Sequence, residues 1–109
     1  MKYRVRLQPA AIDDLDQAYL NAARHAPQTA GRWFNRFYDT LETLSTNPDR
    51  CAKALENRKS NRELYQYLYG RRPNVFRVIF TIEGDTVWVL RIRRASRRAL
   101  TRRELDESE

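Results

Sequence analysis

Apolar and charged residues alternate at the start of the chain, over residues 2–7 (KYRVRL). A period of two residues is typical of a half-buried β-strand. The pattern places Tyr3, Val5 and Leu7 against a core and turns the three basic side chains between them towards water. We therefore expect the fold to begin with a strand.

Two segments with helical spacing of apolar residues follow. The first covers about residues 9–24, and Pro9 suits its first turn, because proline is tolerated where backbone N–H groups lack partners anyway. The second follows Pro27, ends before Asn47-Pro48, and repeats an aromatic-rich stripe: Ala30, Trp33, Phe34, Phe37, Tyr38, Leu41 and Leu44. The short link between the segments predicts an antiparallel helix hairpin, and the stripe is interpreted as core.

Acidic residues gather near the start of the first predicted helix, at Asp13, Asp14 and Asp16. Carboxylates in a first helical turn offset the positive end of the helix dipole. We expect that role for them, rather than a metal cluster.

The second half of the chain predicts three further strands, at about residues 62–69, 74–82 and 86–94. Residues 49–60 form a polar, irregular connection, and Gly70 with Pro73 marks a turn. The segment from Ala99 onward is expected to be a short helix or a mobile tail. Together these elements predict a single α+β domain over residues 1–109: a strand, a helix hairpin and a three-strand antiparallel meander packed on the helices.

The last two strands predict a specific register. A three-residue loop, Glu83-Gly84-Asp85, would pair the apolar residues of both strands on one face, with Phe80 opposite Trp88, Val78 opposite Leu90 and Phe76 opposite Ile92. Arg77 would then lie opposite Arg91 on the other face. A two-residue loop would set Val78 against Arg91, and we expect the three-residue loop for that reason.

The sequence allows two orientations for the strand over residues 62–69. If Leu64 and Leu68 join the core, Tyr65, Tyr67 and Tyr69 share the face of the arginines. The competing arrangement turns the tyrosines inward, because a buried tyrosine is stable when its hydroxyl finds a partner.

The distribution of charge predicts a binding surface on this fold. The formal net charge is +7 and the isoelectric point about 10.1, which favours a polyanionic partner such as nucleic acid or an acidic protein. The charge is uneven, since residues 61–103 hold 11 arginines against three acids. Like charges opposite each other destabilise a sheet, so the placement of Arg77 opposite Arg91 indicates a function. The alternative is that these arginines extend into water or pair with nearby acidic residues.

Other site classes find little support. Cys51 is the only cysteine, so no intrachain disulfide forms, which suits a reducing cytoplasm. His25, the only histidine, precedes Pro27 and is interpreted as a polar cap at a helix end. One cysteine and one histidine cannot form a structural zinc site, and no glycine-rich phosphate loop occurs. We expect no metal, no cofactor and no membrane span, and a soluble protein of the cytoplasm.

The candidate site is therefore the arginine-bearing sheet face. Guanidinium groups bind phosphate in bidentate fashion, and tyrosine rings stack on bases. The candidate residues for catalysis are Arg77, Arg93 and Arg94. The candidates for binding RNA or a partner are Arg91, Arg97, Tyr65, Tyr67, Lys53 and Lys59.

The same residues carry a resemblance. Residues 76–80 (FRVIF), the acidic turn Glu83-Gly84-Asp85 and residues 89–94 (VLRIRR) resemble the RelE/ParE superfamily of bacterial type II toxins, which includes plasmid stabilisation proteins. The opening strand followed by PAAIDDL is similar to the family's start. The likeness covers nearly the whole chain and implies a toxin that inhibits growth and is neutralised by a cognate antitoxin.

The RelE branch implies ribosome-dependent cleavage of mRNA, an endoribonuclease activity. By this resemblance Arg77 matches the phosphate-binding arginine, Arg93 or Arg94 matches the arginine of the last strand, and Lys53 and Lys59 match basic residues upstream. The chain departs from the RelE pattern near Leu100, where it lacks a tyrosine or comparable proton donor. Arginine is a poor proton shuttle because its pKa is so high.

The ParE branch implies poisoning of DNA gyrase by protein binding, without catalytic residues. The missing proton donor fits this branch, but the sequence leaves both branches open. A third reading, outside the toxins, is a basic module that binds nucleic acid.

Overall fold

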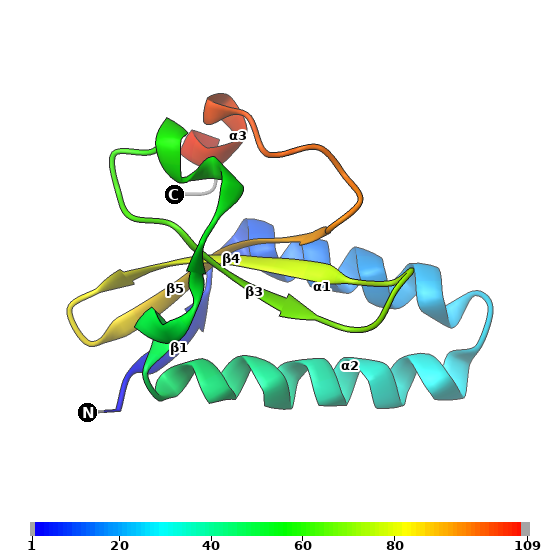
Figure 1. Cartoon of the computed structure of the whole chain (residues 1–109). Coiled ribbons are helices and arrows are strands. Elements are labelled where there is room, and N and C mark those ends of the chain that lie inside the picture. Colours follow the sequence, from blue (N-terminus) through cyan, green and yellow to red (C-terminus); the bar gives the residue numbers. More distant parts are fainter. Residues whose placement is uncertain (1, 108–109) are drawn as a thin grey trace.

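The computed structural model describes residues 2–107 and arranges them in three layers: two helices, a sheet, and a thinner layer that contains residues 95–107 (Figure 1). The elements in chain order are β1 Arg4–Leu7, α1 Pro9–Ala23, α2 Pro27–Glu42, η1 Thr43–Ser45, η2 Pro48–Arg50, β2 Ala52–Lys53, η3 Leu55–Lys59, β3 Tyr65–Tyr69, β4 Phe76–Glu83, β5 Thr86–Arg94 and α3 Arg102–Glu107. The predicted α+β class, helix hairpin and meander are confirmed. The short strand β2 was not predicted.

The sheet has five strands in the order β1-β5-β4-β3-β2. β1 runs parallel to β5, with Arg4 opposite Thr86 and Leu7 opposite Val89, and all other neighbours are antiparallel. The first strand of the chain thus lies beside the last.

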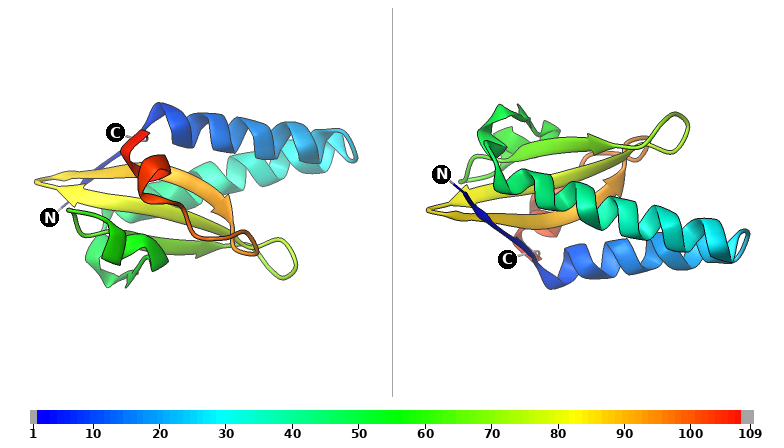
Figure 2. Two further views of the ribbon diagram at one scale, coloured as in Figure 1. Left: turned by 90° about the horizontal axis from the view of Figure 1, so that it is seen from above. Right: turned by 90° about the horizontal axis from the view of Figure 1, so that it is seen from below.

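Both helices cover one face of the sheet (Figure 2, right). The core between helices and sheet is fully apolar: Ala11, Leu15, Phe37, Leu41, Leu44, Phe76, Val78, Phe80, Val87, Val89 and Ile92. Trp33 makes ring contacts to Phe37 and Phe76 with centroids 5.3 and 5.4 Å apart, so the aromatic stripe of α2 is core, as predicted. Tyr3, Val5 and Leu7 pack against this core, also as predicted.

The acidic residues of α1 do not lie in its first turn. The helix begins at Pro9, and no acidic residue occupies that turn. The expectation that Asp13, Asp14 and Asp16 offset the helix dipole is wrong, because the helix starts four residues before the first of them. At the other end of α1, His25 Nδ1 lies 3.2 Å from the carbonyl oxygen of Asn21, which confirms the polar cap.

The β4–β5 hairpin corrects the predicted register. Its loop has two residues, Gly84 and Asp85, and Glu83 pairs with Thr86. Gly84 has φ 59°, which is the conformation glycine supplies at the first loop position of a type II′ turn. A β-bulge then shifts the register, because Phe80 pairs with Val89 whereas Ile79 pairs with Arg91.

The bulge explains how a two-residue loop keeps the apolar faces together. Val87 and Val89 face the helices before it, and Ile92 faces them after it, opposite Val78. Trp88 and Leu90 instead face the other side of the sheet. The predicted pairs of Phe80 with Trp88, Val78 with Leu90 and Phe76 with Ile92 are therefore wrong, since one extra residue in β5 resets the alternation.

The second face of the sheet is also covered. The C-terminal segment, residues 95–107, and η3 lie across it (Figure 2, left). They enclose a second apolar cluster, made of Ala54, Leu64, Ile79, Leu90, Leu100 and Leu105. The tail is thus a packed helix-bearing segment as far as residue 107, and residues 108 and 109 lie outside the described part of the chain.

β3 has the second of the two orientations that the sequence allowed, with its tyrosines turned inward. Tyr65, Tyr67 and Tyr69 pack towards the helices, and Leu64 enters the second cluster. Leu68 is 55% exposed instead of buried. The expectation that the tyrosines share a face with the arginines is wrong, because in an antiparallel pair each tyrosine faces the same side as its partner in β4, namely Phe80, Val78 or Phe76.

Candidate functional site

Arg77, the first candidate, is 2% exposed. Its two terminal nitrogens donate to the carboxylate oxygens of Glu56 at 2.9 and 2.7 Å, and one of them also donates to Gln66 at 3.1 Å. The same carboxylate accepts the backbone N–H of Leu100 at 2.8 Å. Arg77 is therefore part of a buried network that ties β4 to η3 and to the C-terminal segment.

The charge state of Glu56 follows from this network. Burial raises the pKa of Glu56, but the hydrogen bonds from Arg77 and from the backbone of Leu100 outweigh burial and hold the pKa below its ordinary value. The Glu56 carboxylate is thus ionised and bound, whereas the buried Nε of Arg77 has no hydrogen-bond partner in the described part of the chain. An Arg77 side chain in solvent, as the exposed arginine face would require, is not what the structure shows.

Arg93 lies opposite Arg77 in the sheet, in the place that the predicted register gave to Arg91. It is 6% exposed, and its Nε donates to the carbonyl oxygen of Arg98 at 2.8 Å. Burial lowers the pKa of Arg93, and the nearby Arg97 lowers it further. Arg77 and Arg93 both hold the C-terminal segment on the sheet.

Arg91 points towards α1. Its Nε and Nη2 donate to Asp14 at 2.7 and 3.0 Å, and the backbone N–H of Ile92 donates to the same carboxylate at 2.9 Å. The hydrogen bond from Arg91 to Asp14 raises the pKa of Arg91. The guanidinium group of Arg91 is therefore engaged in an ion pair within the protein.

The other predicted binding residues fall into two places. Lys53 lies 2.9 Å from Glu63 and 4.0 Å from the ring centroid of Tyr65, which itself stacks on Phe80. Lys59 Nζ donates to the carbonyl oxygen of Leu100 at 3.2 Å. None of these contacts brings Lys53, Lys59 or the tyrosines together with Arg77 in one site.

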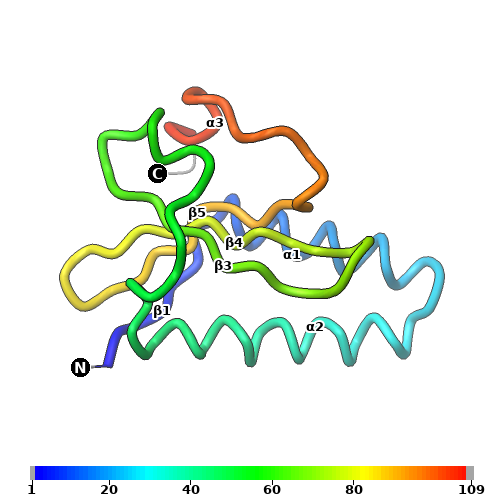
Figure 3. Tube along the Cα trace, viewed as in Figure 1, coloured from blue at the N-terminus to red at the C-terminus, as the bar shows by residue number. Residues whose placement is uncertain are grey.

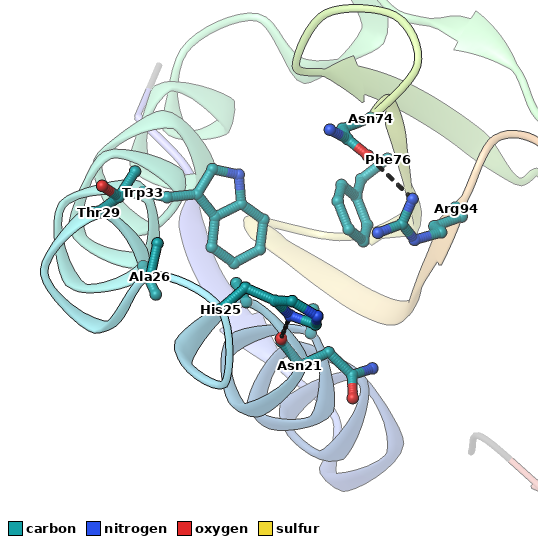
Figure 4. Close-up of a pocket in the computed structure, with 11 residues that line it drawn as sticks. Asn21, His25, Ala26, Thr29, Trp33, Asn74, Phe76 and Arg94 are labelled. Atoms are coloured by element: carbon teal, nitrogen blue, oxygen red, sulfur yellow. Dashed lines mark hydrogen bonds between the residues drawn. The ribbon is translucent and has the colours of Figure 1, made fainter.

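Arg94 and Arg97 are the arginine candidates that remain exposed. The Arg94 guanidinium lies 5.4 Å from the ring centroid of Phe76 and donates to Asn74 Oδ1 at 3.0 Å. It borders a cavity of about 370 Å³ that opens between the helices and the end of the sheet and is lined by His25 and Trp33 (Figure 4). A second cavity of about 250 Å³ lies beside Arg94 and Arg97, along α1.

Two acidic residues bind candidate arginines, Glu56 to Arg77 and Asp14 to Arg91, and the sequence did not predict this role for either. Glu56 lies in a polar, irregular connection that carries no periodic signal. Asp14 could have been found, because it lies three residues after Ala11 and four before Ala18, on the packed stripe of α1.

Within residues 2–107, no group of three or more metal-binding side chains comes together. In the same part of the chain, no helix has the length and apolarity that crossing a bilayer requires. Cys51 is a half-buried free thiol whose pKa is raised by burial.

Comparison with known proteins identifies a family that this chain matches. A family model described as the ParE toxin of the type II toxin-antitoxin system, parDE, matches residues 5–99. A solved structure of the chromosomal ParDE TA system from P. aeruginosa is similar at 20% identity and a TM-score of 0.68, over 85% of this chain and 96% of that one. The toxin-antitoxin complex RelBE2 from Mycobacterium tuberculosis is similar at 22% identity and a TM-score of 0.52, over 86% and 99%. A search of curated protein sequences gives no match.

Proposed function

Because this chain belongs to the ParE toxin family of type II toxin–antitoxin systems, we propose that it inhibits growth by binding DNA gyrase, and that it does not cleave mRNA. The observation that carries the proposal is the burial of Arg77 against Glu56. The resemblance to RelE assigned phosphate binding to this arginine.

Cleavage of RNA through its 2′-hydroxyl needs cations at the phosphate and a group that moves a proton. Two of the three candidate catalytic arginines, Arg77 and Arg93, are buried and bound to the chain's own groups. Arg94 remains exposed, but arginine is in general a poor proton shuttle. The tyrosines of β3 lie on the sheet face that the helices cover, away from Arg77 and Arg93.

An inhibitor that acts by binding needs only a stable exposed surface. The fold supplies one, since both sheet faces are packed and the surface is strongly basic, with a formal net charge of +7. The same charge favours a cognate antitoxin that is acidic where it covers the toxin.

The proposal is tested with the purified protein in two assays run side by side. We expect loss of negative supercoiling by gyrase at micromolar protein, and intact mRNA on translating ribosomes at the same concentration. A variant that cannot fold, Phe37→Asp, serves as the matched control, because Phe37 is fully buried. Codon-dependent cleavage of mRNA together with normal supercoiling would refute the proposal.

A further inference from the structure

Four exposed arginines gather at one end of the sheet: Arg71, Arg72, Arg94 and Arg97, here called the basic end. The first two lie in the β3–β4 turn, and the others lie where β5 passes into the C-terminal segment. The backbone N–H of Ala95 donates to the carbonyl oxygen of Val75 at 2.8 Å and joins the two segments. Figures 2 and 3 show them side by side.

The basic end differs from several other arginines of this half of the chain. Arg62, Arg77, Arg91 and Arg98 each pair with a carboxylate, at 3.0, 2.7, 2.7 and 2.7 Å. Over residues 2–107, no carboxylate forms an ion pair with any arginine of the basic end. The adjoining cavity is also lined by Asp14, which already binds Arg91.

Two separate hollows lie beside three of these arginines. Leu68, Pro73, Val75 and Ala95 line an open depression of about 570 Å³ with Arg72 at its border, and Arg94 and Arg97 border the cavity beside α1. Four like charges gathered at one end of the sheet, with no acidic partner among the described residues, repel one another, so an external anion is the natural complement. Arginine binds phosphate oxygens in bidentate fashion better than lysine does, and the basic end contains arginine alone.

We propose that the basic end binds the phosphate backbone of duplex DNA. Binding uses charge and the guanidinium fork, and it reads no base sequence. The inference goes beyond the proposed function, because it gives the basic end a ligand other than gyrase. A toxin with both contacts engages gyrase while the enzyme holds DNA.

The test is fluorescence anisotropy of a labelled DNA duplex titrated with the purified protein between 50 and 200 mM salt. Four phosphate contacts predict a slope of log K against log salt of about −3 to −4. The variant Arg71→Glu/Arg97→Glu should weaken binding at least about tenfold and reduce the slope by about 2. The milder Arg71→Gln/Arg97→Gln should give an intermediate loss, and circular dichroism checks that each variant is folded.

The matched control is Arg32→Glu/Arg36→Glu. Both residues are exposed on α2, and the change in net charge is identical. We expect this control to keep affinity within about threefold and to keep the slope. Equal losses in both pairs would show attraction by net charge alone and would overturn the inference.

Three further outcomes would also overturn it: no binding of duplex by the wild type, tighter binding of single-stranded RNA, or displacement by polyglutamate as effective per charge as by DNA. The last result would assign the basic end to an acidic protein. Because no gyrase is present, failure here leaves the proposed function standing. Conversely, an inactive supercoiling assay beside normal DNA binding removes only the proposed function.

Discussion

Asp14 of α1 and Arg91 of β5 are joined by a bidentate ion pair, with Nε–Oδ2 and Nη2–Oδ1 distances of 2.7 and 3.0 Å. β1 pairs with β5 only as far as Val89, so the outer edge of β5 has no strand beyond that residue. The Asp14 carboxylate takes the place of a strand there, because it also accepts the N–H of Ile92. An aspartate on a helix thus closes an open sheet edge.

Replacing Asp14 by alanine should reduce the free energy of unfolding by about 2–3 kcal/mol, since a partly buried guanidinium and a backbone N–H lose their acceptor. Urea denaturation measures the change, and hydrogen exchange at Ile92 should accelerate. Asp13→Ala is the matched control, because Asp13 is exposed, and it should change stability by less than about 0.5 kcal/mol. Equal effects of both substitutions would contradict the role given to Asp14.

Breaking the Arg77–Glu56 pair should be the most damaging single change of charge in the protein. Arg77→Ala is expected to cost about 3–5 kcal/mol, because it leaves a fully buried carboxylate without its cation. The sequence alone assigned Arg77 to a binding face rather than to a buried network. Replacing both partners, as in Arg77→Met/Glu56→Leu, should recover much of the loss in thermal denaturation, and a double variant no more stable than the single one would argue against this account.

Acid should loosen the C-terminal segment through Glu104. The hydrogen bond from Arg98, with help from Thr101, lowers the pKa of Glu104 from the ordinary 4.5 to about 2. A lowered pKa in the folded state contributes stability that is complete above pH 4.5 and is lost as the pH falls towards 2. The melting temperature of the wild type should therefore fall more steeply between pH 5 and 2.5 than that of Glu104→Gln. Parallel curves would contradict the assignment.

The two turn glycines should respond differently to alanine. Gly70 has φ 102°, and a Cβ there would collide with the backbone carbonyl oxygen of Asn74. Gly84 has φ 59°, and a Cβ there would meet open space. Gly84→Ala should therefore cost about 1 kcal/mol, and Gly70→Ala clearly more, in denaturant unfolding. A larger loss at Gly84 than at Gly70 would be inconsistent with these turn geometries.

The layered fold could be predicted from periodicity because each helix and strand carries its own repeat. The stripe from Ala30 to Leu44 and the alternation of Tyr3, Val5 and Leu7 needed no tertiary information. The register of the last hairpin did need it. A bulge at Leu90 is one residue in one strand, and no local signal separates it from a longer loop.

The prediction of an exposed site around Arg77 was wrong for a related reason. Alternation correctly placed Arg77 on the face away from the helices, but it could not show that Leu100 and Leu105 return to cover that face. Burial of an arginine depends on a carboxylate 21 residues away in the chain, which only the fold brings near. Arg94 and Arg97, at the uncovered end, keep the exposure that the sequence predicted.

The parallel contact between residues 4–7 and residues 86–89 has a consequence for synthesis on the ribosome. Translation delivers residues 4–7 long before residues 86–89, so β1 has no sheet partner until β5 has left the ribosome. The apolar side of the helix hairpin stays uncovered for the same time, because the hairpin of β4 and β5 supplies its cover. A product that ends before residue 86 cannot form this strand pair and cannot reach the native topology.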